Sequence, residues 1–308
     1  MKISRYAPLA KRFVNVLFSY RKNHKYKVRI ISINLKRMCG NIKTFAKVIL
    51  IGVLTTVFRV IGQLLIPTGT PQTVLQPSIF SANGTLPIVF MVYGIIAYSI
   101  LSAMYLLIRE NLSGYKLGKG LKYGVACAII WTSYLLEPLP HVISLLDKVT
   151  YPIADSAALI VMGLLLGLFL SKSTPSKTCV RKSSRMRFDV LLISAFFVVG
   201  RFIQYSYFKI YSSFETEMVQ TLLWVVLAGI AISFVVLWFN GLLPTQNKWK
   251  KALLTGLVLF GVDLLLFNLF VPLVFSADIL DLIIRTVVDT IAVTIGLLVT
   301  NIQIAKAK

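Results

Sequence analysis

The sequence predicts an all-α membrane protein, a polytopic bundle of about eight transmembrane helices arranged as two parallel four-helix repeats. Three observations support this fold class: the composition, the spacing of the apolar segments, and the distribution of cations between them. Of the 308 residues, 57% are hydrophobic and 14% are charged. The charged share is about half that of an average soluble domain. A soluble core cannot bury so much apolar surface, whereas a lipid bilayer solvates it.

Eight apolar segments, bounded by charged residues or by Pro or Gly, have lengths that suit helical spans. They are 48–66, 87–108, 121–137, 152–170, 189–209, 218–242, 252–274 and 282–304. The segment 121–137 is the weakest, because it is short, begins next to Lys122 and ends at Glu137-Pro138. It needs tilt or local thinning of the bilayer in order to cross, and a re-entrant segment is the alternative.

The stretches that connect these segments alternate in charge. Lys and Arg concentrate in alternate stretches, which hold 27 of the 33 such residues: 1–47, 109–120, 171–188, 243–251 and 305–308. The stretches between them hold one Lys and five acidic residues. Because cationic loops stay on the cytoplasmic side during insertion, this alternation predicts a multi-pass plasma-membrane protein with both termini in the cytoplasm.

The N-terminal segment 1–47 is basic, with 13 Lys and Arg and no acidic residue, and it has apolar residues at helical spacing. We expect a cytoplasmic amphipathic segment that binds anionic lipid headgroups as well as fixing the topology. Its composition also resembles a mitochondrial presequence, which makes an organellar membrane the alternative location. The net charge of +22 is therefore assigned to topology, and no nucleic acid partner is expected. Translation could start at Met1 or at Met38.

Short similarities between the two halves predict an internal duplication. The matched stretches are 59–63 (RVIGQ) with 201–205 (RFIQY), 135–139 (LLEPL) with 269–273 (LFVPL), and 155–158 (DSAA) with 289–292 (DTIA). Each half has an even number of spans, so the repeats share one orientation and are related by a pseudo-twofold axis along the membrane normal. The predicted units are a first repeat, 48–170, a basic linker, 171–188, and a second repeat, 189–308.

Six ionisable residues lie within the predicted spans and are the candidate site residues: Arg59, Asp155, Arg201, Asp263, Arg285 and Asp289. A charged side chain at mid-helix costs about 2.5–3.5 kcal/mol on insertion scales, so each should find a partner. From their depth along the helices, we expect Arg59 to pair with Asp155 and Arg201 with Asp289, one ion pair in each repeat.

A competing arrangement uses Asp281, Arg285 and Asp289, which are spaced by four residues and share one helix face. Pairing among these three would leave Arg201 available for an anionic ligand. The six residues are therefore either structural ion pairs or, for the three Arg, the lining of an outward-facing cavity for an anion or a lipid phosphate. Asp263 is either a hydrogen-bonded structural residue or a proton carrier.

Other polar and small residues add less. Glu137 and Asn268 are further polar candidates near helix ends. Two GxxxG steps, Gly120–Gly124 and Gly163–Gly167, indicate close helix packing. The three Cys and two His are too few and too scattered for a metal site or a disulfide framework, and no cofactor is expected. No nucleotide-binding or hydrolase motif is present, which disfavours an enzyme without excluding one.

Two functions fit these observations. One is a small secondary transporter or permease for an anionic solute or lipid, and the other is a non-catalytic membrane scaffold or assembly protein. A lipid-modifying enzyme that uses the Arg residues for phosphate is a third possibility. A water-accessible cavity with Arg59, Arg201 and Asp263 would favour transport, whereas a closed bundle with all charges paired would favour the scaffold. The substrate and the oligomeric state are left open.

Overall fold

The computed structural model describes residues 42–65, 74–141, 145–172 and 185–306, and the named elements in this part of the chain are all helices. Contacts divide the chain into two units between Lys47 and Val48, and the unit that begins at Val48 is described by itself. Within it, one isolated antiparallel bridge joins Pro77 to Phe275.

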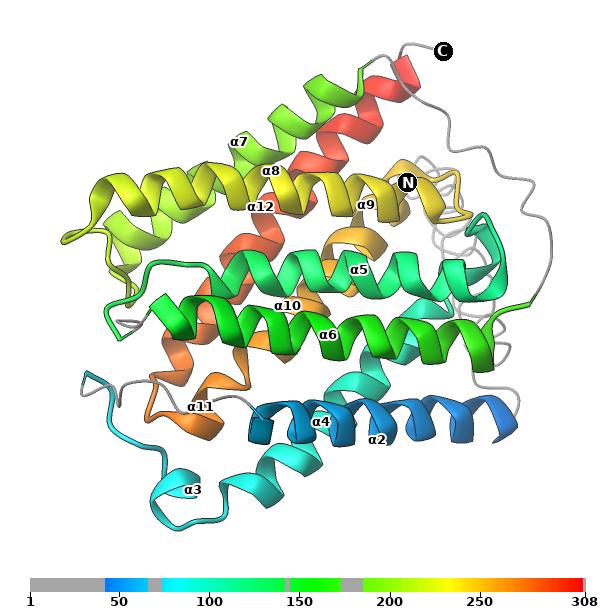
Figure 1. Ribbon diagram of the computed structural model, residues 1–308. Coiled ribbons are helices and arrows are strands. Elements are labelled where there is room, and N and C mark those ends of the chain that lie inside the picture. Colours follow the sequence, from blue (N-terminus) through cyan, green and yellow to red (C-terminus); the bar gives the residue numbers. More distant parts are fainter. Residues whose placement is uncertain (1–41, 66–73, 142–144, 173–184, 307–308) are drawn as a thin grey trace, which may run out of the picture. The chain divides into compact units, whose positions relative to one another are not determined.

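Eight helical stretches overlap the eight apolar segments that the sequence predicts. Seven are α2 (Ile42–Leu65), α4 (Leu86–Tyr105), α5 (Lys116–Leu135), α6 (Leu145–Leu170), α7 (Met186–Ile203), α8 (Met218–Leu242) and α12 (Ile279–Lys306). The other stretch consists of α9 (Lys248–Leu253), the π-helical segment Leu254–Val262 and α10 (Asp263–Asn268), which follow one another directly (Figure 1). Short elements complete the order: α3 (Ile79–Ala82), the 3-10 turn Arg109–Asn111, the π-helical segment Gln204–Phe208 and α11 (Val271–Val274).

Six of these helices are long and apolar enough to cross a membrane, which is compatible with an integral membrane protein. They are Ile42–Leu65, Leu86–Tyr105, Lys148–Leu170, Met218–Leu242, Lys248–Val274 and Ile279–Gln303. The helices α5 and α7 are not among the six, so the predicted number of eight spans is not established. Both contain several charged residues: α5 has three Lys within its first seven residues, and α7 contains Arg187, Asp189 and Arg201.

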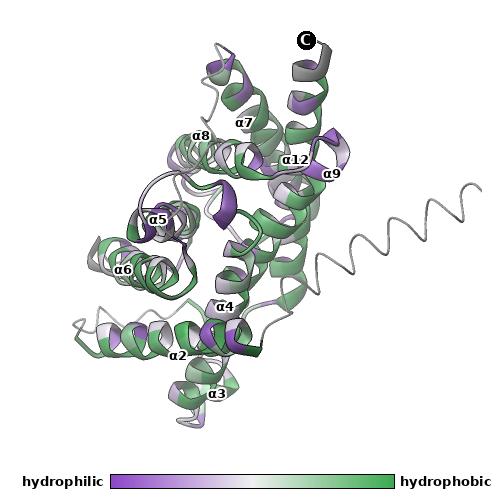
Figure 2. Ribbon diagram, turned by 90° about the vertical axis from the view of Figure 1, so that its right-hand side faces the viewer, coloured by the Kyte–Doolittle hydropathy of each residue, from purple (hydrophilic) through white to green (hydrophobic). Residues whose placement is uncertain are grey.

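The helix α8 illustrates how the helices divide their surface. Val219, Leu223 and Leu227 are spaced by four residues, share one face and are each more than half exposed. Trp224 and Ala228 lie on the opposite face and are buried. Hydrophobic residues also predominate in the other long helices, as the hydropathy colouring of the ribbon shows (Figure 2). Extended exposed apolar surface of this kind marks contact with a membrane or a partner.

The helices α5 and α6 cross with almost no side chain between them. A Cβ atom placed on Gly163 would lie 2.7 Å from the carbonyl oxygen of Gly120, and one on Gly167 would lie 2.8 Å from the Cα of Leu117. Cβ atoms on Gly120 and Gly124 would also collide with the backbone of α6. The two GxxxG steps therefore act in close packing, as the sequence predicts.

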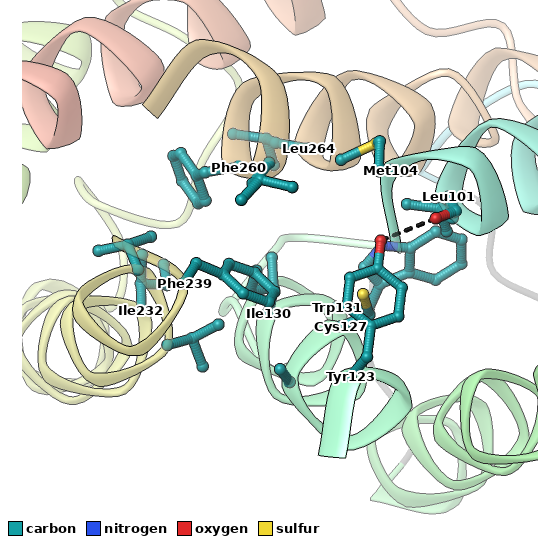
Figure 3. Packing of buried hydrophobic residues seen from close by; sticks show 14 of the residues in the cluster. Leu101, Met104, Tyr123, Cys127, Ile130, Trp131, Ile232, Phe239, Phe260 and Leu264 are labelled. Carbon is teal, nitrogen blue, oxygen red and sulfur yellow. Dashed lines mark hydrogen bonds between the residues drawn. The ribbon is translucent and has the colours of Figure 1, made fainter. Parts of the chain in front are cut away.

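The core forms around the remaining faces of α5 (Figure 3). Tyr123 of α5 donates a hydrogen bond of 2.8 Å from its hydroxyl to the carbonyl oxygen of Leu101 in α4. Trp131 of α5 is buried, as are Phe239 of α8 and Phe260 of the π-helical segment. This packing holds α4, α5, α8 and the stretch from α9 to α10 in one cluster, and so fixes where the buried polar residues lie.

Candidate functional site

The smaller of two buried charge clusters joins α2 to α6. Arg59 of α2 is 5% exposed and forms an ion pair through its Nε with the Oδ1 of Asp155 in α6. Its Nη1 donates a hydrogen bond of 2.7 Å to the Oε1 of Gln63, one turn further along α2. The guanidinium lies over the ring of Phe90 in α4, 5.8 Å from its centroid. We call these four residues the Arg59 cluster.

The larger cluster, which we call the Arg201 cluster, contains Arg201, Asp289, Glu137, Arg285 and Asp281. Arg201 of α7 is fully buried and forms two ion pairs. Its Nη2 lies 2.7 Å from the Oδ2 of Asp289 in α12, and its Nη1 lies 3.1 Å from the Oε1 of Glu137. The guanidinium thus bridges two carboxylates from different parts of the chain, for which its fork of donors is well suited.

Glu137 lies at the centre of the Arg201 cluster. It follows the end of α5 by two residues, and its Oε2 accepts a hydrogen bond of 2.5 Å from the Nη1 of Arg285. The hydroxyl of Tyr205 donates to its Oε1 over 3.3 Å. Arg285 also lies 3.7 Å from Asp281, whose side chain is 15% exposed. Positive and negative groups therefore alternate from a fully buried carboxylate at Asp289 towards the surface at Asp281.

Neutral side chains complete the surroundings of Asp289 and Arg201. Gln204 donates from Nε2 to the Oδ1 of Asp289 over 2.6 Å, and Tyr134 donates from its hydroxyl to the Oδ2 over 2.9 Å. The Arg201 guanidinium also lies over the rings of Trp224 and Tyr134, 4.9 and 5.2 Å from their centroids. Further hydrogen bonds offset the cost of burying an ion pair. Here they satisfy both oxygens of Asp289, whereas the Nε of Arg201 has no hydrogen-bond partner among the described residues. The π-helical segment Gln204–Phe208 places Gln204 and Tyr205 so that each reaches an acid.

A histidine lies next to the more exposed end of the Arg201 cluster. The Nδ1 of His141 is 3.2 Å from the hydroxyl of Tyr211, whose backbone carbonyl accepts a 2.6 Å hydrogen bond from Arg285. Burial lowers the pKa of His141, the charge of Arg285 lowers it further, and Glu137 opposes them. Neutral imidazole is therefore favoured at this position.

Asp263 stands apart from both clusters, at the first residue of α10. It is fully buried, and its Oδ1 accepts a hydrogen bond of 2.6 Å from the indole nitrogen of Trp131 in α5. Its Oδ2 has no hydrogen-bond partner among the described residues. The hydrogen bond to Trp131 is what a structural role of Asp263 predicts, and the Oδ2 without a partner among the described residues is what a proton carrier requires. The structure therefore leaves both interpretations of Asp263 in place.

The structure brings together both ion pairs expected from the sequence, Arg59 with Asp155 and Arg201 with Asp289. Of the competing arrangement along α12, the contact between Asp281 and Arg285 is present, but Arg201 is not left without a carboxylate. Asn268 donates to the hydroxyl of Thr286 over 2.8 Å.

The sequence underestimated Glu137 and missed three neighbours, Tyr134, Gln204 and Tyr205. Only the position of Glu137 beside Pro138, at the end of an apolar segment, signalled it. A second polar group also went unnoticed, in which Asn240 donates to the Oδ1 of Asn301 over 2.8 Å.

A groove lies between α5 and α8, towards the ends of these helices that are remote from Glu137. Its volume is about 480 Å³, within the range of about 300–1,000 Å³ typical of small-molecule sites. We call it the α5–α8 groove; its lining residues are Leu112, Ser113, Leu121, Lys122, Val125, Ala126, Ile129, Phe234, Val235, Trp238 and Leu242. None of the six candidate residues belongs to it.

These features define a class of protein: an all-helical chain with six helices suited to membrane crossing and with charges buried in mutual contact. Comparisons with models of protein families, with curated proteins and with solved structures gave no match to this chain. Among the described residues, no group of three or more His, Cys, Asp or Glu is arranged to hold a metal ion. The clusters and the groove are therefore the features of this chain that bear on its function.

Proposed function

We propose that the protein is a small secondary transporter or permease for an anionic solute or lipid, with eight spans in two parallel repeats and both termini in the cytoplasm. In this proposal α5 and α7 complete the eight spans, and residues 1–47 bind anionic headgroups. The observation that carries it is an asymmetry between the two ends of one helix pair. The helices α5 and α8 are bonded together at one end and have a groove beside them at the other.

The equivalence of the two clusters supports the repeats. In each half, an Arg from the first helix pairs with an Asp from the fourth and lies over an aromatic ring from the second. Phe90 and Trp224 supply the rings, and they are 134 residues apart in the sequence. Asp155 and Asp289 are also 134 residues apart. Chance similarity of apolar helices would not reproduce both the spacing and the contacts.

Hydrogen bonds between the halves have the same symmetry. The indole nitrogen of Trp224, in the second helix of the second half, donates to the carbonyl oxygen of Ser133 over 2.7 Å. The hydroxyl of Tyr93, in the second helix of the first half, donates to the carbonyl oxygen of Leu266 over 2.8 Å. Each bond ends near the close of the third helix of the other half. This reciprocity is what a pseudo-twofold axis along the membrane normal requires.

The asymmetry along α5 and α8 supports transport by alternating access. At the predicted outer end, the hydrogen bond from Trp224 and the ion pairs of Glu137 tie α5 to α7, α8 and α12. At the predicted inner end, the α5–α8 groove lies beside the same two helices, which there keep the contact between the rings of Tyr123 and Phe239, 5.9 Å between centroids. In this proposal the Arg201 cluster is a latch that holds the two halves together at the outer side. The α5–α8 groove is the part of the substrate path that is open at the inner side. Transporters of this kind rock one repeat against the other.

Distances between pairs of spin labels, measured by double electron–electron resonance, test this proposal. One pair, at Leu136 and Val219, reports on the latched end, and another, at Leu117 and Gly241, reports on the grooved end; all four positions are exposed. Glu137→Gln weakens the latch, so we expect a new population with a longer distance at the latched end and a shorter one at the grooved end.

Glu110→Gln is the matched control, because Glu110 is exposed and, among the described residues, has Arg109 as its ion-pair partner. Should Glu137→Gln fail to fold, Trp224→Phe removes a single latch bond instead. Identical distance distributions in the folded latch variant and the native protein would overturn the proposal.

A second candidate function is a non-catalytic membrane scaffold or assembly protein. It is favoured by the pairing of Arg59, Arg201 and Arg285 with carboxylates, and by a groove that contains none of them. In that case the ion pairs only fix the helix packing. Glu137→Gln would then lower the unfolding temperature while leaving both distance distributions unchanged.

A further inference from the structure

We infer that the α5–α8 groove binds an anionic phospholipid of the inner leaflet, with one acyl chain between the helices and the headgroup at Lys122. This inference deepens the proposed function, because it names a lipid as the transported anion and rests on that proposal for the movement itself. The binding has its own test, given below.

The walls of the groove suit an acyl chain rather than a water-soluble anion. Apart from Ser113 and Lys122, every lining residue is apolar. Val125 and Ile129 of α5 and Phe234 of α8 are also more than a third exposed, so the groove opens sideways through apolar side chains. In a helix pair that crosses the membrane, such an opening faces the hydrocarbon of the bilayer. A free anion would have to leave water for an apolar surface, which is unfavourable.

Among the described residues that line the groove, Lys122 is the one cation, and it lies at one end of the apolar path. The Nζ of Lys122 donates 2.9 Å to the carbonyl oxygen of Ser113, with the Ser113 hydroxyl 3.4 Å away. An ammonium group has three donors, so at least one stays available for a headgroup. Gly114 adopts a φ of +112°, which favours glycine and lets the loop turn beside Lys122. The ammonium is thereby held at the end of the groove.

Next to Lys122, a hydrogen bond closes the groove at the end of α8. Asn111 donates from Nδ2 to the carbonyl oxygen of Leu242, the last residue of α8, over 2.7 Å. The neighbouring Leu112 and Leu242 both line the groove. The apolar path thus stops where the cation is found, near the predicted inner surface. An acyl chain that ends in an anionic headgroup matches an apolar groove that ends at a cation. A phospholipid of the inner leaflet has both the acyl chain and the headgroup.

Quenching of tryptophan fluorescence by brominated lipids tests the binding. Trp238 lines the groove, so the difference in quenching between the native protein and Trp238→Phe reports on groove occupancy. The full chain is reconstituted in nanodiscs of phosphatidylcholine that contain increasing fractions of phosphatidylglycerol, with bromine on the acyl chains of either lipid. We expect a preference of about fivefold for phosphatidylglycerol, which corresponds to one well-placed cation at an anionic surface.

Three variants decide the outcome. Lys122→Met should reduce the preference to none, whereas Lys116→Met, the matched control on the exposed first turn of the same helix, should retain it. Val125→Phe should lower the Trp238 signal for both lipids by narrowing the groove. Equal quenching by both lipids in the native protein, or an unchanged preference in Lys122→Met, would overturn the inference. Neither result depends on the spin-label distances, so a failure of lipid binding is distinguishable from a failure of the transport proposal.

Discussion

The Arg59 and Arg201 clusters share an Arg, an Asp and an aromatic ring, and they differ in the further charged residues that the Arg201 cluster contains. In both, an Arg meets an Asp and an aromatic ring. The Arg59 cluster uses residues of the first half only. The Arg201 cluster adds Glu137 from the first half, and through it Arg285 of α12. An ion pair within one half can fix a fold, whereas one shared between two halves also controls how they meet.

One position explains this difference. In the proposed duplication, Glu137 corresponds to Val271, 134 positions further on, so the two clusters have one such acid between them. Arg59 donates a further hydrogen bond from Nη1 to Gln63, from its own helix. Arg201 instead reaches a second carboxylate, which requires a partner 64 residues away in the sequence. If the duplication holds, this one position distinguishes the ion pair of Arg59 from the connection that Arg201 makes to the first half of the chain.

The largest effect should come from removing the shared cation. Arg201→Met leaves Asp289 buried without its guanidinium and Glu137 with Arg285 as its remaining cation, and we expect a loss of about 3–5 kcal/mol in the free energy of unfolding. Arg59→Met, the matched variant, should cost about 1–3 kcal/mol, because Asp155 is partly exposed and can be hydrated. Reversible unfolding in mixed micelles measures both.

Exchange of the two charges sharpens this comparison. Asp155→Arg combined with Arg59→Asp should recover most of the stability that each single change removes, because the pair is largely isolated. The corresponding exchange of Arg201 with Asp289 should recover much less, because Glu137 would then face a carboxylate. Equal recovery at the two sites would contradict the distinction between them.

Asp263, which has no ion-pair partner among the described residues, should show an effect of intermediate size on the free energy of unfolding. Asp263→Asn keeps an oxygen for the indole of Trp131, so the free energy of unfolding should change by less than about 1 kcal/mol. Asp263→Leu leaves that buried N–H without an acceptor and should cost about 1–3 kcal/mol. Thermal unfolding monitored by circular dichroism compares the two variants. A larger loss in the Asn variant than in the Leu variant would show that the charge itself matters.

The smallest effect should come from pH. The pKa of His141 is lower in the folded protein than its ordinary value near 6.5, so the unfolded chain takes up the proton first. Stability should therefore be complete above pH 7 and fall as the pH drops below about 6.5. The difference in unfolding temperature between pH 7.5 and 5.5 should be smaller in His141→Gln than in the native protein. An identical pH dependence in both would remove His141 as the cause.

The ion pair of Arg59 with Asp155 could be predicted from the sequence, because the depth of each residue in the membrane could be estimated. Arg59 and Asp155 lie at similar distances from the predicted outer surface, and a membrane leaves few other partners for a buried charge, so their pairing followed. Glu137 was underestimated because its contacts reach Arg201 and Arg285 across 64 and 148 residues. The π-helical turn that presents Gln204 and Tyr205 has no local sequence signal. The groove was also unpredictable, since its walls come from distant helices.

The glycine crossing of α5 and α6 has a mechanical consequence. Where two backbones touch directly, no rotamer can turn aside to let one helix slide past the other. Any swing of α5 must therefore carry α6 with it, and with α6 goes Asp155 and its partner Arg59. In the proposed transport cycle, the Arg59 cluster therefore moves together with α5 and α6, while the Arg201 cluster breaks and re-forms.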